Sequence, residues 1–137
     1  MLRQRQPRNG VTVMECAVVV PLVFLILAGT IIGALGVFRY QEIAALAREG
    51  ARFAAVRGQR YEFQTGNKAA TPQDVYEQVI LPRAVALDQT QLTYSVTWSP
   101  DNRQGGTVIV QLNYRWIPEA LLGGIQFSST STMLVSY

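Results

Sequence analysis

The sequence predicts an α+β fold: a long N-terminal transmembrane helix, extended into a stalk, that packs on a small antiparallel β-sheet. Three observations predict it. No charged residue lies between Glu15 and Arg39, residues 39–58 are rich in helix formers, and polar and apolar residues alternate in two stretches after residue 90. We therefore expect a single-pass membrane protein with three parts, namely a basic leader at 1–10, a transmembrane helix and stalk at 11–58, and an exported α+β domain at 59–137.

The uncharged run defines the membrane span. It extends from Cys16 to Phe38 and has 23 residues, which as a helix cover roughly 30 Å or more, the thickness of a bilayer core. We expect the helix to begin near Val13, after an unstructured polar leader that contains Pro7. Three arginines in the leader favour a cytoplasmic N-terminus, which places the residues after the span outside.

The stalk follows the span without a helix breaker. Small residues recur at helical spacing on one side, and Arg48 and Arg52 lie four residues apart on another. We expect the narrow side to pack against the sheet and Gly58 to cap the end of the helix. The small residues are Ala44, Ala47, Ala51, Ala54 and Ala55.

Short elements are predicted for the rest of the chain. Residues 59–70 form a polar loop, and Thr71-Pro72 begins a short helix, with Thr71 as N-cap, that Pro82 ends. Alternating residues predict strands at 91–98 and 107–116, joined by a turn-rich loop. An apolar crossover at 117–125 and a final Ser/Thr-rich strand at 127–137 complete a sheet of three or slightly more strands.

Composition excludes several classes of function. The net charge of +3 comes from the leader, because removing its three arginines leaves nine basic and nine acidic residues, so we expect no nucleic-acid partner. The chain has no histidine, and its one cysteine, Cys16, lies at membrane depth. No phosphate-binding loop or metal-ligand cluster occurs. We expect no catalytic residue, metal, cofactor or small-molecule substrate, and therefore no enzyme.

Three segments make the chain similar to a known family. They are Gly10-Val-Thr-Val-Met-Glu15 before an apolar run with Pro21, then Ala47-Arg48-Glu49-Gly50-Ala51-Arg52 and the residues up to Ala55, and finally Pro118 through Gly124 into Leu134. With these segments the chain resembles the TadE-like family of pilus-assembly proteins, the minor pilin-like subunits of the tight-adherence (Flp-type) pilus. The resemblance implies a pilin-like fold and a location in the bacterial inner membrane. It implies other pilin-like subunits, pilus-assembly membrane proteins, a prepilin peptidase and membrane lipid as partners.

The resemblance also implies processing and docking sites. Cleavage after Gly10 would make Val11 the N-terminus and Glu15 the fifth residue of the mature chain. The new α-amino group is mostly protonated at neutral pH, and Glu15 of the same or a neighbouring subunit supplies an anion for it. Gly29 and Gly33 form a small-xxx-small motif that lets two membrane helices approach closely.

Three interpretations remain open from sequence. The first is a processed minor pilin-like subunit, and the second is an unprocessed single-pass scaffold protein of a pilus or secretion assembly complex. In the second, Glu15 only interacts favourably with the helix dipole. The third is a secreted protein whose residues 1 to about 36 are a signal peptide, although the uncharged run is longer than the usual apolar region of about 7–15 residues.

Overall fold

The first element is one long helix. The computed structural model describes residues 9–118 and 123–136, and α1 spans Asn9–Val56, 48 residues with Pro21 inside it. The predicted start near Val13 is therefore wrong by four residues, because nothing between Asn9 and Val13 interrupts a helix and the nearest proline precedes it. Contacts divide the chain into two compact units, Met1–Leu35 and Gly36–Tyr137, and α1 contributes to both.

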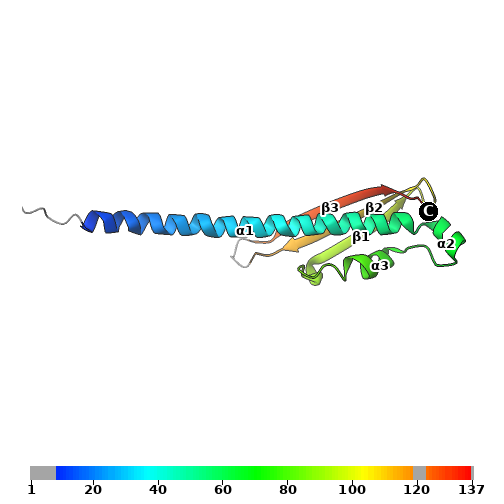
Figure 1. The fold of residues 1–137 in the computed structure, drawn as a ribbon, viewed down its shortest axis with the longest axis horizontal. Helices are drawn as coiled ribbons and strands as arrows, with labels where there is room; N and C mark the ends of the chain where they lie inside the picture. Colours follow the sequence, from blue (N-terminus) through cyan, green and yellow to red (C-terminus); the bar gives the residue numbers. More distant parts are fainter. Residues whose placement is uncertain (1–8, 119–122, 137) are drawn as a thin grey trace, which may run out of the picture. The chain divides into compact units, whose positions relative to one another are not determined.

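The second unit contains a three-stranded antiparallel sheet. Its strands are β1 (Leu92–Ser99), β2 (Thr107–Trp116) and β3 (Ile125–Leu134), in the order β1-β2-β3. Val96 pairs with Val110, and Val110 pairs with Ser131 on its other side. In Figure 1 the second half of α1 lies along one face of this sheet. The predicted α+β class, with a long apolar helix packed on a small antiparallel sheet, is confirmed.

The core lies between α1 and the sheet. Ile43, Ala47, Ala51 and Ala54 are fully buried on α1, and their spacing of three to four residues keeps them on one side of the helix. They face the apolar side of the sheet, where Val108, Val110 and Leu112 of the central strand are fully buried. The predicted packing of the small-residue side against the sheet is confirmed. Small side chains allow the helix backbone to approach the strands closely.

A short helix replaces part of the predicted loop. α2 spans Gln59–Thr65 and ends at Gly66, whose φ of 71° is the left-handed conformation that glycine adopts readily. Gln59 N–H donates to the carbonyl of Asn102 at 2.8 Å, which holds α2 against the β1–β2 loop. The prediction that Gly58 caps α1 is also wrong, because α1 ends at Val56 and Gly58 is the N-cap of α2.

The next helix begins as predicted. Thr71 caps α3 (Pro72–Val75): its hydroxyl accepts the Asp74 N–H at 3.2 Å, and the Asp74 carboxylate accepts the Thr71 N–H at 2.9 Å. η1 (Tyr76–Ile80) continues the chain, and the predicted apolar side of the two elements is buried at Val75, Val79 and Ile80. Tyr76 stacks on Tyr94 of β1 with ring centroids 4.3 Å apart. The 3-10 helix η2 (Gln89–Gln91) leads into β1.

Replacing Thr71 by alanine removes the hydroxyl half of this capping box and leaves the backbone N–H of residue 71, which still donates to the Asp74 carboxylate. The pKa of Asp74 is lowered by the hydrogen bonds from the Thr71 hydroxyl and backbone N–H, so the carboxylate stabilises the fold at neutral pH and loses that effect as the pH falls through its folded pKa. We expect the T71A variant to lose about 1 kcal/mol of unfolding free energy. The pKa of Asp74, followed by carbon NMR during an acid titration, should rise toward its ordinary value. Thr71→Ser keeps the hydroxyl and should preserve both quantities; an unchanged pKa in T71A would contradict the assignment.

Candidate functional site

The first candidate region is the apolar part of α1. Every side chain from Thr12 to Ile31 is exposed, and apolar residues cover the whole circumference of the helix, as the consecutive Val18, Val19 and Val20 show. The most apolar window has a mean hydropathy of 2.7 and none of it is buried within the chain. A continuous apolar surface of this extent is unstable in water. In length and composition, this one helix of the described chain is sufficient to cross a membrane.

The predicted processing and docking residues lie along this region. Gly10 and Val11 belong to the first turn of α1, so the peptide bond between them is helical in this structure. Glu15 is exposed and, within the described chain, has no hydrogen bond or ion pair. A Cβ built on Gly29 or Gly33 meets no atom of the chain within 4 Å, so both positions are open to a neighbouring helix.

The stalk motif divides between two sides of α1. Ala47, Gly50 and Ala51 are buried against the rest of the unit, whereas Arg48, Glu49 and Arg52 are exposed. A Cβ built on Gly50 would lie 3.2 Å from Val75 Cγ1 and 3.4 Å from Val110 Cγ1. The glycine therefore stands where α1, α3 and β2 meet, and a side chain longer than a methyl group would displace its neighbours there.

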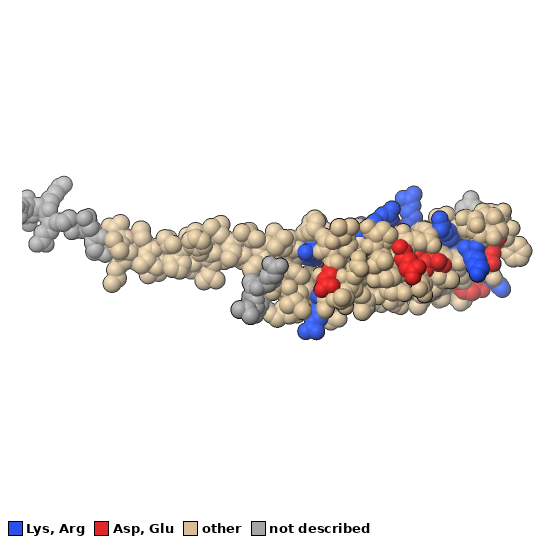
Figure 2. Space-filling view, turned by 90° about the horizontal axis from the view of Figure 1, so that it is seen from below, with Lys and Arg blue, Asp and Glu red and all other residues tan. Residues whose placement is uncertain are grey.

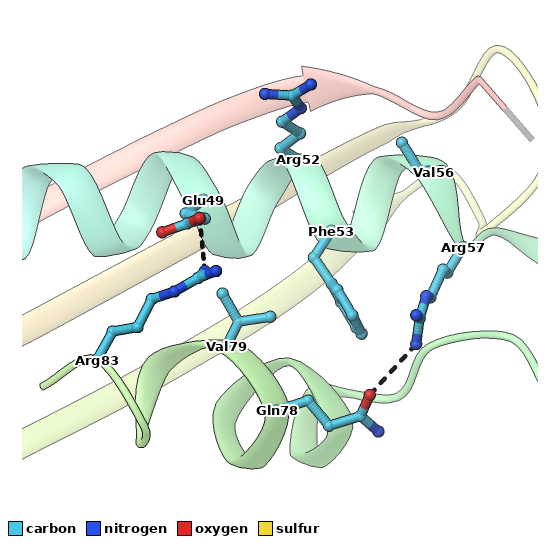
Figure 3. A pocket seen from close by; sticks show the side chains of 8 residues that line it. All are labelled: Glu49, Arg52, Phe53, Val56, Arg57, Gln78, Val79 and Arg83. Carbon is cyan, nitrogen blue, oxygen red and sulfur yellow. Dashed lines mark hydrogen bonds and ion pairs between the residues drawn. The ribbon is translucent and has the colours of Figure 1, made fainter.

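The exposed side of the motif borders an open groove of about 610 Å³ between α1 and η1 (Figure 3). Glu49 Oε1 pairs with Arg83 Nη1 at 2.5 Å, and Arg57 Nη1 donates to Gln78 Oε1 at 3.2 Å. The first interaction joins α1, and the second joins the residue directly after α1, to the segment that contains η1. The groove is lined by Glu49, Arg52, Phe53, Val56, Arg57, Gln78, Val79 and Arg83.

The groove has an apolar floor and a basic rim. The Arg57 guanidinium lies 4.2 Å from the centroid of the Phe53 ring, a cation–π contact that holds the arginine over the floor. Figure 3 shows Arg52 pointing away from Phe53 and from η1, so Arg57 and Arg83 are the cations directed across the groove. Both already have partners within the chain. The arrangement fastens helices together and resembles no catalytic constellation.

Outside the groove, the charged side chains that the structure describes offer few candidate sites. On the face shown in Figure 2, charged side chains gather over the second unit. No group of three or more potential metal ligands exists among the residues that the structure describes. Threonine hydrogen bonds, from Thr71 and Thr90 respectively, lower the pKa values of Asp74 and Asp88. A general acid at neutral pH needs the opposite shift, so neither carboxyl is suited to that role.

The comparison with known families identifies the helical segment. Residues 10–52 match the family model described as TadE-like protein. This segment is TadE-like. The match begins at Gly10 and covers the apolar run, Glu15 and the stalk motif through Arg52, which confirms the family resemblance there. The match relates this segment to pilus-associated proteins. No curated protein and no solved structure gives a significant match to the chain.

The sheet lies outside the residues that match the TadE-like model. The third segment of the resemblance, from Pro118 to Leu134, therefore stays a prediction, and its residues 119–122 lie outside the described part of the chain.

The groove between α1 and η1 was not predicted from the sequence. Its two connections join residues 34 and 21 positions apart, Glu49 with Arg83 and Arg57 with Gln78. No local spacing signals such pairs, because they depend on how η1 folds back along α1.

Proposed function

We propose that this protein is a minor pilin-like (pseudopilin) structural subunit in the assembly of a tight-adherence pilus. One observation carries the proposal: the TadE-like segment coincides with a helix that is apolar all round from Cys16 to Phe38, has one glutamate near its start and continues unbroken to Val56. Such a helix can serve first as a membrane anchor and then as a packing element among identical or related helices. The sheet-bearing unit then remains outside the membrane.

Processing after Gly10 by a prepilin peptidase is part of this proposal. A glycine before the cut allows the backbone to enter a narrow protease site without a side chain in the way. Cleavage creates a cationic amine at Val11, and Glu15 offers a carboxylate without a partner in the described chain. We propose that Glu15 pairs with the amine of the same or a neighbouring subunit and so guides docking, because an unpaired charge is costly in a bundle of apolar helices.

The proposed partners and location follow from the same helix. Gly29 and Gly33 present a small surface on which another pilin-like helix or an assembly protein of the membrane can pack. The basic leader supports an inner-membrane protein with a cytoplasmic N-terminus and an external C-terminal unit, which later enters an extracellular filament.

We propose a structural and not a catalytic role. The chain has no histidine, and its one cysteine lies in the apolar segment. The described pocket between α1 and η1 is a shallow groove whose charged groups are used to join helices. These features support a subunit that acts through packing surfaces.

The N-terminal residue of the protein purified from native membranes tests the proposal. We expect Val11. An intact Met1 would favour the alternative, an unprocessed single-pass scaffold protein of the assembly complex. One observation favours that alternative: α1 begins at Asn9, so the Gly10–Val11 bond must unwind before a protease can cut it. A start near Val37 would contradict both and indicate a cleaved signal peptide.

A further inference from the structure

An aromatic cluster surrounds the point where the uncharged part of α1 ends. The Trp116 ring lies against Gly36, where an added Cβ would approach Trp116 Cζ3 to 3.0 Å. Phe127 stacks on Trp116 with centroids 6.0 Å apart and meets Tyr40 edge-on at 6.1 Å. All of these residues belong to the second unit, so their arrangement does not depend on the placement of residues 1–35.

Exposed apolar side chains extend this cluster. Val37 and Phe38 of α1, Ile117 after β2 and Ile125 at the start of β3 are between 44 and 58% exposed. Trp116 pairs with Ile125 in the sheet, which places the two strand ends side by side. One end of the sheet therefore presents tryptophan, phenylalanine and isoleucine at the same level as the last uncharged residues of the helix.

We infer that this end of the sheet is a second membrane contact, which seats the exported unit on the bilayer surface. Its members are Trp116, Ile117, Ile125 and Phe127, together with Phe38 and Tyr40 of α1. This inference rests on the membrane location proposed above and does not depend on cleavage.

The position of the transmembrane span indicates which partner the aromatic cluster contacts. The uncharged run ends at Phe38, and a run of 23 residues is about the length needed to cross the hydrocarbon core, so Gly36 to Phe38 leave the bilayer near its surface. Trp116 contacts the helix at Gly36, which brings the strand ends to that depth. Tryptophan and tyrosine concentrate at membrane–water interfaces, where one side of the ring is apolar and the other is hydrated. Lipid is therefore the partner that this cluster fits.

Two arginines lie next to the cluster in the sequence, where basic residues are expected at a membrane surface. Arg39 is the first charged residue after the run, and Arg115 precedes Trp116 and is exposed. The exposed Arg115 side chain can reach headgroup phosphates while the neighbouring aromatic rings stay in the interface, whereas Arg39 is partly buried and its Nη1 is covered by the chain.

The two tryptophans of the chain provide a matched test. Trp98 pairs with Val108 near the other end of β2, eight residues or about 26 Å along the strand from Trp116. The full-length protein is reconstituted in phospholipid vesicles as two single-tryptophan variants, Trp98→Phe and Trp116→Phe. Fluorescence is quenched in parallel by nitroxide labels near the headgroup end of the acyl chain, by labels near its terminal methyl, and by acrylamide in water. Both substitutions keep an aromatic ring, so both variants should fold.

We expect Trp116, the fluorophore of the Trp98→Phe variant, to lose about half of its emission to the shallow label and less to the deep one. Trp98 should respond to acrylamide alone. If the protein floats with the vesicles but the lipid labels quench neither tryptophan, the inference is overturned. The transmembrane span would not be affected by that result. Protein that fails to float with the vesicles would overturn the inference together with the proposed anchoring.

Discussion

Replacing Gly50 by leucine should lower the unfolding free energy by about 2 kcal/mol. Even a Cβ at this position would lie 3.2 Å from Val75 Cγ1, and the three further carbons of leucine must displace α3 or β2. Overpacking of this kind costs about 1–3 kcal/mol, occasionally more, and the better helix propensity of leucine offsets nearly 1 kcal/mol of it. Thermal unfolding of the full chain in detergent micelles, followed by near-ultraviolet circular dichroism, measures the change.

Two controls separate packing from helix propensity. Gly50→Ala adds only the Cβ, which Val75 and Val110 can accommodate with small shifts, so the gain in propensity should leave the stability nearly unchanged. Gly29→Leu makes the same change on α1 where no atom of the chain lies within 4 Å of the added Cβ. We expect no loss of stability in that variant. A melting temperature for Gly50→Leu equal to that of the native chain would show that α1 does not pack on α3 and β2 as described.

Periodic patterns made the larger elements predictable. Residues 107–116 alternate so regularly that the predicted and observed bounds of β2 coincide, because one face of the strand is buried by α1 and the other is open. The buried side of α1 was equally predictable, because Ala47, Ala51 and Ala54 repeat at helical spacing and pack on the sheet. In both elements a single buried face imposes the pattern on the sequence.

Elements without a buried face were predicted less well. α2 has no buried residue, so its sequence carries no apolar side, and the helix depends on the hydrogen bond from Gln59 to Asn102 and on the left-handed Gly66. The start of α1 was misplaced for a similar reason. From Thr12 onward its first turns are exposed in the described part of the chain, and hydrophobic periodicity cannot locate the end of a helix that is apolar on every side.

The candidate functional residues also differ in whether the sequence alone could predict them. Glu15 could be proposed from sequence because a lone carboxylate beside a long apolar run is costly, and its role stays a prediction. The contact of Trp116 with Gly36 could not, because it joins residues 80 positions apart. Knowledge of the sheet register, which sets Trp116 beside Ile125 and Tyr114 beside Phe127, was needed to assemble the aromatic cluster.

The two parts of α1 have different physical constraints. From Thr12 to Ile31 every side chain is exposed, so this stretch can be covered only by lipid or by other helices. From Ile43 to Ala55 one side is buried by the chain's own sheet, so packing is satisfied without a partner. Substitutions in the second stretch should therefore change stability, whereas substitutions in the first should change association while the sheet-bearing unit stays folded.

Glu15→Gln should leave insertion and cleavage intact and prevent entry into filaments. The substitution keeps the shape of the side chain and removes its charge, so the amine of Val11 would lose its proposed anion. Loss of one partner of a buried charge pair costs about 3–5 kcal/mol, which corresponds to a hundredfold or greater loss of docking. We expect the amount of the variant recovered in sheared filaments to fall about tenfold or more, because other helix contacts remain. Glu15→Asp keeps the charge and should retain part of the incorporation into filaments.

The helix dipole is the competing explanation for this glutamate, and the structure makes it weak for the intact chain. α1 begins at Asn9 and has no acidic residue in its first turn, so Glu15 lies beyond the region where the dipole acts. N-terminal sequencing of the membrane-bound variant distinguishes the remaining roles. Accumulation of chains that start at Met1 would place the effect of Glu15 at the peptidase. Normal filament incorporation of correctly cleaved Glu15→Gln would show that subunit docking does not depend on its charge.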